Sequence, residues 1–173
     1  MALFLSTFTN KIDKKKRVSV PASFRALMKE NAFVAFRSLT QPAIEGFSMQ
    51  QMQGFSKKID HFQLFSEDQS DLTASIFADA EALAFDKEGR IPLSDELIAH
   101  AELKSHVCFV GRGATFQLWN PETFKDYQQK ARQRLMVRRP KLVDGKGQEE
   151  NTEKVNREEA QKTSAARMWD SKD

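Results

Sequence analysis

Two patterns of apolar and polar residues run along the chain, and both occur twice. Short apolar runs typical of strands flank short segments whose apolar residues recur at helical spacing. Each unit is therefore predicted to run strand, tight turn, short strand, helix, strand, strand and helix. The short helices should each have one apolar face, formed by Phe24, Leu27 and Met28 in the first unit and by Leu97, Ile98 and Ala101 in the second.

The two units resemble one another closely enough to predict an internal repeat. Residues 13–20 match residues 86–93 at an offset of 73 residues. Further matches follow in the same order at nearly the same offset, since residues 33–36, 44–48 and 49–52 correspond to 107–110, 116–120 and 121–124. Elements repeated in one order at one period are difficult to explain by chance.

Two further helices are predicted outside the repeated core. Leu72, Ile76, Phe77 and Ala80 have helical spacing and predict a connecting helix, and a longer helix should run from Pro121 to about Arg139. Pro140 should end it, and the charged segment beyond should be disordered. We accordingly divide the chain into a first repeat with its following helix, a connecting helix, a second repeat with a C-terminal helix, and a tail, at residues 1–62, 63–80, 81–139 and 140–173.

Composition narrows the function classes. The chain has 173 residues, a formal net charge of +3 and a pI near 9.0, which gives weak support for a polyanionic partner. The single cysteine, Cys108, excludes an internal disulfide framework and lies in an apolar run, so we expect it to be buried. No apolar stretch is long enough to span a bilayer and the N-terminus lacks a signal-peptide pattern, so we expect a cytoplasmic protein.

An enzyme is not expected. The three histidines, His61, His100 and His106, are scattered and form no recognised metal spacing with acidic residues. No nucleophile elbow, P-loop or zinc motif is present in the sequence. We therefore expect no catalytic residue, no metal, no cofactor and no small-molecule substrate.

The chemistry of the repeat centres on an Asp-x-x-x-Arg turn between two strands, Asp13 to Arg17 in the first copy and Asp86 to Arg90 in the second. An aspartate in a turn can accept hydrogen bonds from nearby backbone N–H groups. An arginine just past the turn can pair with that aspartate and still direct its planar donors at a phosphate or a guanine edge. We therefore interpret Asp13 and Asp86 as structural turn residues.

The first turn is far more basic than the second, because Lys14, Lys15, Lys16 and Arg17 are consecutive. Only one acid is local, so these cations cannot all be paired within the turn. Such a cluster is the electrostatic footprint expected for phosphates. Two alternatives stay open: the basic turn is merely solvated, or Arg17 and Arg90 are structural partners of the two aspartates.

These residues resemble a known family. The segment from Phe4 to Arg25 closely resembles the opening of MraZ proteins, which belong to the SpoVT/AbrB-like DNA-binding superfamily. The segment from Asp86 to Leu93 resembles the second half of that family. The resemblance covers roughly residues 1–135 and leaves the tail beyond Pro140 uncovered.

The resemblance implies both a fold and a function. It implies an α+β chain of two tandem swapped-hairpin AbrB-like repeats that form a pseudo-twofold β-barrel with flanking helices. It further implies a homo-oligomeric ring that binds double-stranded DNA at direct repeats upstream of its own division and cell wall gene cluster. The expected role is a nucleoid-associated transcriptional regulator, acting as a repressor.

The resemblance also assigns site residues. The family's DNA contacts carry over to Lys15 and Arg17 in the first turn and to Arg90 in the second. We expect Lys14 and Lys16 to contact the DNA backbone as well. Glu88 replaces the lysine of the first turn and should repel phosphate, so we predict an asymmetric site dominated by the first turn.

One departure from the family concerns the backbone. The family glycine before the arginine is retained as Gly89 but is replaced by Lys16 in the first turn. If this position needs a positive φ, Lys16 is strained by about 1 kcal/mol.

The alternative function is an oligomeric assembly or partner-binding protein with an incidental basic turn. The dependence of binding on salt separates the two functions, because only phosphate binding weakens steeply as ionic strength rises.

Overall fold

The computed structural model describes residues 3–59 and 66–138 of the chain. Contacts divide the chain into a compact unit of residues 1–130, which contains both repeats, and a second unit of residues 131–173. The predicted disorder of the tail beyond Pro140 falls outside the described residues, as does His61. The features that follow belong to the first unit unless stated otherwise.

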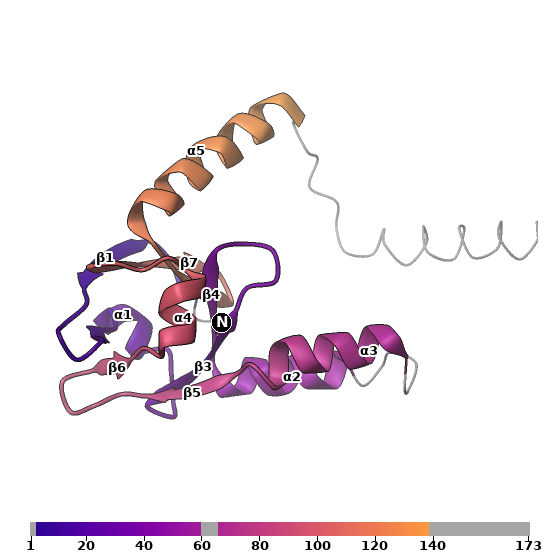
Figure 1. The fold of residues 1–173 in the computed structure, drawn as a ribbon, viewed down its shortest axis with the longest axis horizontal. Coiled ribbons are helices and arrows are strands. Elements are labelled where there is room, and N and C mark those ends of the chain that lie inside the picture. The colour runs from indigo at the N-terminus through magenta and orange to yellow at the C-terminus, as the bar shows by residue number, and fades with distance from the viewer. Residues whose placement is uncertain (1–2, 60–65, 139–173) are drawn as a thin grey trace, which may run out of the picture. The chain divides into compact units, whose positions relative to one another are not determined.

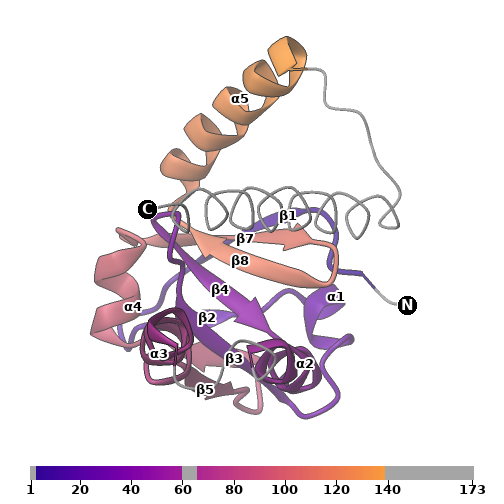
Figure 2. The same cartoon turned by 90° about the vertical axis from the view of Figure 1, so that its right-hand side faces the viewer.

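Within the described residues, eight antiparallel strands form a six-stranded sheet and a two-stranded ribbon (Figure 1). The sheet has the order β1-β7-β8-β4-β3-β5, and Figure 2 shows β7, β8, β4 and β3 in succession. The ribbon pairs β2 with β6. The strands are β1 (Thr7–Lys11), β2 (Arg17–Ser19), β3 (Ala32–Arg37), β4 (Ala43–Phe47), β5 (Glu81–Ala84), β6 (Arg90–Pro92), β7 (His106–Arg112) and β8 (Thr115–Trp119).

The strand pairing follows the sequence repeat. The first strand of each repeat pairs with the third strand of the other, since β1 pairs with β7 and β5 with β3. In two further pairs, equivalent strands of the two repeats pair with each other, so a pseudo-twofold axis passes between them. In the β2–β6 pair Val18 lies opposite its equivalent Ile91, and in the β4–β8 pair Glu45 lies opposite its equivalent Gln117. The repeats are therefore interleaved rather than folded side by side, and neither half can form its sheet alone.

The implied closed β-barrel is not found among the described strands. The ladder of the sheet ends at β1 and β5, and the β2–β6 ribbon is separate from it. Each ribbon strand has only three residues, and its backbone groups are taken up by the other ribbon strand and by its own turn. Val18, for example, is already shared between Ile91 and a single bridge to Ile12. Among the described residues, this single bridge next to β1 is the pairing that joins the ribbon to the sheet.

The described residues also form five α-helices, as the mixed α+β expectation required. The short helix of the second repeat begins where Ser94 accepts a hydrogen bond from the backbone N–H of Leu97, at 3.3 Å. The first short helix ends earlier than its apolar pattern suggested, at Arg25. The helices are α1 (Ala22–Arg25), α2 (Met49–Ile59), α3 (Glu67–Leu72), which continues as a π-helical turn at Thr73–Phe77, α4 (Asp95–His100) and α5 (Pro121–Arg138).

Phenylalanine rings fill the main core between the sheet and the ribbon. Phe116 is fully buried and packs edge-on against Phe24 and Phe33, with ring centroids 5.4 and 5.0 Å away. Phe24 comes from α1, so this short helix is fixed by the ring that it buries. Cys108 is buried as expected, in a second cluster with Trp119.

Gly46 on β4 packs tightly against this core. A Cβ atom added there would lie 2.8 Å from Cε1 of Phe116 and closer still to other atoms of that ring. We predict that Gly46→Ala lowers the free energy of unfolding by about 1–3 kcal/mol, because a fully buried ring cannot move aside. Urea denaturation measures the loss.

The matched control is Gly54→Ala on α2, where an added Cβ would meet no atom within 4 Å. This variant should gain up to about 1 kcal/mol, because alanine favours a helix over glycine. Equal midpoints for the two variants would contradict the packing at Gly46.

Candidate nucleic-acid interface

The first turn is organised by the carboxylate of Asp13. Its Oδ1 accepts hydrogen bonds from the backbone N–H groups of Lys15 and Arg17, at 2.8 and 2.9 Å. The backbone of Asp13 also closes the turn, because its N–H donates to the carbonyl of Arg17 and its carbonyl accepts from Lys16. The predicted structural role of Asp13 thus has a definite geometry: one side chain satisfies the backbone donors that the loop exposes.

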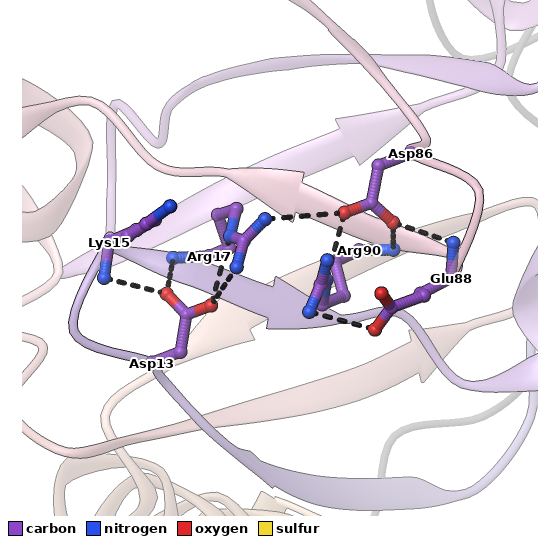
Figure 3. A network of polar contacts seen from close by, with 6 residues as sticks. All are labelled: Asp13, Lys15, Arg17, Asp86, Glu88 and Arg90. Atoms are coloured by element: carbon purple, nitrogen blue, oxygen red, sulfur yellow. Dashed lines mark hydrogen bonds and ion pairs between the residues drawn. The ribbon is translucent and has the colours of Figure 1, made fainter.

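The second turn repeats this arrangement atom for atom (Figure 3). Oδ1 of Asp86 accepts from the backbone N–H groups of Glu88 and Arg90, both at 2.9 Å. The N–H of Asp86 donates to the carbonyl of Arg90, and its carbonyl accepts from Gly89. Segments 73 residues apart in sequence therefore fold into the same turn.

The ribbon brings the two turns together. Antiparallel pairing places Arg17 opposite Pro92 and Ser19 opposite Arg90. As a result Nη1 of Arg17 lies 3.7 Å from Oδ2 of Asp86, across the boundary between the repeats. The two turns form one site, which we name the paired-turn site (residues 13–17 and 86–90; Figure 3).

Both arginines are paired inside the site. Arg17 donates from Nε to Oδ2 of Asp13 at 2.9 Å, and its Nη2 lies 2.8 Å from the same oxygen. Arg90 donates from Nε to Oδ2 of Asp86 at 2.8 Å, and its Nη1 lies 2.8 Å from Glu88. The structural pairing considered from the sequence is therefore present. It does not bury the guanidinium groups fully, because the side chains of Arg17 and Arg90 remain 30% and 22% exposed.

The three lysines of the first turn are exposed, and they differ in their partners. Lys16 forms an ion pair with Asp95, the first residue of α4. Lys15 contacts Asp13 only through its backbone N–H (Figure 3). Over residues 3–59 and 66–138, no ion pair involves the ammonium group of Lys14 or Lys15. Within the first turn, these two ammonium groups are the cations left available.

The fourth position of each turn has a left-handed backbone. Its φ is 57° at Lys16 and 73° at Gly89, which confirms that the position needs a positive φ. Gly89 is also buried, and the guanidinium of Arg25 lies where its side chain would be, with Cζ 2.5 Å from an ideal Cβ. A residue with a side chain would therefore be strained at position 89 and would also displace Arg25.

Two residues near the turns were missed by the sequence reasoning. Arg25 donates from Nε to the carbonyl of Val20, whose N–H in turn donates to Gly89. Asp95 reaches the first turn from the opposite repeat. Each turn is thus flanked by the short helix of the other repeat. Only the interleaved register creates these contacts, so no local motif in the sequence could have shown them.

Backbone hydrogen bonds lower the pKa values of both turn aspartates. The N–H of Arg90 is the main cause at Asp86, where burial opposes the effect and the Arg90 side chain adds to it, and the pKa falls from 3.8 to about 2. The N–H of Arg17 likewise lowers the pKa of Asp13. Asp86 in turn raises the pKa of Arg90. Both carboxylates are therefore ionised at neutral pH and hold the arginines in place.

Other kinds of site find little support in the part of the chain that is described. There, no group of three or more His, Cys, Asp or Glu side chains is arranged to hold a metal ion. His100 lies 3.2 Å from the carbonyl of Gln41, and His106 lies 2.9 Å from the hydroxyl of Ser105. Among the described helices, none has the length and apolar character needed to cross a membrane.

Known proteins are similar in sequence to this chain over most of its length. A family model described as "MraZ protein, putative antitoxin-like" matches residues 3–74 and 76–141. A transcriptional regulator MraZ of Gluconobacter oxydans is 43% identical, over 85% of this chain and 96% of its own length. Proteins of the same name from Pelagibacter ubique and Rickettsia bellii are 41% and 40% identical, over 81% and 73% of this chain and 92% and 87% of their own lengths.

The chain belongs to the MraZ family. The family model covers both repeats, so the resemblance first seen around the two Asp-x-x-x-Arg turns extends to the whole described fold. Lys16 occupies the position that Gly89 holds in the second turn, and its backbone has the same left-handed conformation.

We predict that the backbone cost at Lys16 can be measured by comparing two variants. Lys16→Gly and Lys16→Ala both lose the ion pair with Asp95, but only glycine removes the left-handed strain. Lys16→Gly should therefore exceed Lys16→Ala by about 1 kcal/mol in the free energy of unfolding, measured by chemical denaturation.

The reverse change at the second turn serves as the control. Gly89→Ala should be less stable than the unmodified chain, because it gains the strain and meets the Arg25 guanidinium. If glycine gave no advantage over alanine at position 16, the left-handed conformation there would be contradicted.

Acid should weaken the second turn of this MraZ chain in a defined pH window. The pKa of Asp86 in the folded state, about 2, lies below its ordinary value of 3.8. Its charge therefore stabilises the fold fully above 3.8, and this contribution is lost as the pH falls towards 2. The carboxyl resonance of Asp86, followed by NMR, should titrate near 2.

The variant Asp86→Asn should flatten the acid limb of the stability curve in the same pH window. A carboxyl resonance that titrates at the ordinary value in the folded protein would show that the backbone donors do not hold this carboxylate.

Proposed function

We propose that this chain is a DNA-binding transcriptional regulator that contacts duplex DNA through the paired-turn site. The observation that carries the proposal is the exposed pair of unneutralised cations, Lys14 and Lys15, on a loop whose backbone is fixed by Asp13. A rigid turn that presents free ammonium groups suits phosphate oxygens. Membership in the MraZ family, whose relatives are named transcriptional regulators, gives independent support.

Arg17 is the candidate for base recognition. Its Nε and Nη2 are held by Asp13, whereas its Nη1 lies 3.7 Å from Asp86, too far for a hydrogen bond. The guanidinium is thus fixed in orientation by one edge, while Nη1 retains donors for an acceptor on DNA. In this proposal the ion pair positions Arg17, so the structural and functional interpretations of the pair are compatible.

The second turn should contribute less. Its five residues include two acids and two cations, and so carry no net charge. Glu88 also occupies Nη1 of Arg90 at 2.8 Å, on an arginine that is less exposed than Arg17. A phosphate approaching Arg90 would have to displace this carboxylate, so we propose that the first turn dominates the contact.

The finer features implied by the family resemblance complete the proposal. They are a swapped-hairpin repeat, a homo-oligomeric ring, direct DNA repeats upstream of the chain's own division and cell wall gene cluster, repression, and a place on the nucleoid in the cytoplasm. A ring would present several paired-turn sites to successive DNA repeats, so avidity would raise the overall affinity above that of one site. The alternative, a partner-binding protein with an incidental basic turn, predicts no such use of the lysines.

Salt dependence of DNA binding tests the proposal. We predict that the double variant Lys14→Ala/Lys15→Ala binds a duplex from the upstream region of its own gene more weakly than the unmodified chain. The slope of log affinity against log salt should become shallower by about 2 per binding turn, because each lost phosphate contact removes about 0.9 from the slope. Fluorescence anisotropy across a salt series measures both quantities.

The charge-matched control is Lys57→Ala/Lys58→Ala, which removes two exposed cations from α2. It should keep the slope of the unmodified chain. Equal slopes in both double variants would reject the first turn as the phosphate contact, and unchanged affinity of Arg17→Ala, with its fold verified by thermal unfolding, would remove Arg17 from the interface.

A further inference from the structure

Lys16 is the lysine of the first turn that forms an ion pair with an acid of the opposite repeat. Its Nζ pairs with Oδ1 of Asp95 (side chains 54% and 76% exposed), and this is the sole recorded ion pair of either residue among the described parts of the chain. We propose that Asp95 takes the place of a DNA phosphate on Lys16 and so lowers both the affinity and the salt dependence of DNA binding. This inference rests on the proposed function.

Backbone and capping contacts hold the two residues near each other before any ligand arrives. The carbonyl of Lys16 accepts a hydrogen bond from the N–H of Leu93, at 2.9 Å, which ties the first turn to the segment leading into α4. Ser94 caps that helix, and its hydroxyl also donates to Glu81 at 2.6 Å. Asp95 follows directly, so its carboxylate is held beside the turn by the helix start and not by the lysine alone.

The chemistry of the pair makes it a competitor for phosphate. A carboxylate oxygen and a phosphate oxygen accept the same ammonium donors, so one can replace the other on Lys16. Exposed ion pairs are weak, and a DNA phosphate brought close by Lys14 and Lys15 can therefore displace Asp95. The displacement frees a carboxylate that takes up a counterion, which cancels the counterion released from DNA by Lys16.

The neighbouring acid supplies a matched comparison. Glu96 lies next to Asp95 in the first turn of α4 and has the same charge and the same favourable interaction with the helix dipole. Glu96 raises the pKa of Arg37, and among the described residues no ion pair joins it to Lys16. Removing its charge should therefore alter the field near α4 without releasing Lys16.

The experiment compares Asp95→Asn with Glu96→Gln in the full chain, on the upstream duplex and across a salt series. Asp95→Asn should tighten binding at low salt by up to about fivefold, the equivalent of one exposed ion pair. It should also steepen the log–log salt slope by about 0.9, because Lys16 then releases a counterion. Glu96→Gln should change neither quantity to this extent.

A double-variant cycle locates the effect on Lys16. In a Lys16→Gln background, Asp95→Asn should give no gain in affinity and no change in slope. A gain that persists there, or an equal gain from Glu96→Gln, would overturn the inference, because either result indicates general repulsion of DNA by α4. Thermal unfolding of each variant verifies the fold.

Failure of the two proposals can be told apart. If the unmodified chain binds the duplex with no dependence on salt, the proposed function is overturned and this inference falls with it. If the unmodified chain binds with a steep salt dependence and Asp95→Asn leaves affinity and slope unchanged, only the inference is overturned.

Discussion

Each turn of the paired-turn site depends on one carboxylate oxygen that accepts two backbone N–H groups. Oδ1 of Asp13 and of Asp86 fixes the loop, while the second oxygen orients the arginine four residues later. The same side chain therefore holds both the loop and the guanidinium, and makes the short turn rigid. The exposed lysines gain from this rigidity, since less conformational entropy remains to be lost when they meet a ligand.

The interleaved register turns two local motifs into one site. β2 and β6 pair about Val18 and Ile91, and β4 and β8 pair about Glu45 and Gln117. Gln117 is buried and donates to Glu45 at 2.6 Å, so the axis through the sheet is marked by a hydrogen bond between equivalent positions. Because both repeats contribute strands to the sheet and to the ribbon, a change that destabilises one repeat should disturb both turns.

The repeat, the turns and the family could be predicted from the sequence, because they depend on residues close together in the chain. The sequence could not show whether Arg17 forms an ion pair with Asp13 or contacts a ligand, since both roles require the same two residues at the same spacing. The structure shows an arginine that is paired on one edge and partly exposed. The open sheet in place of a closed barrel, and the contacts made by Arg25 and Asp95, depend on long-range pairing that local patterns do not encode.

Lys16 shows how a local cost can be tolerated in this frame. A lysine in a left-handed conformation opposes folding by about as much as a single exposed ion pair can return, so the contact with Asp95 at best offsets the strain. A glycine would remove the strain with no need of a partner, as Gly89 does in the second turn. Stability therefore gives no reason for a lysine here. A lysine at this position is explained if an anion outside the chain stabilises its charge more than Asp95 does. A DNA phosphate beside Lys14 and Lys15 is such an anion.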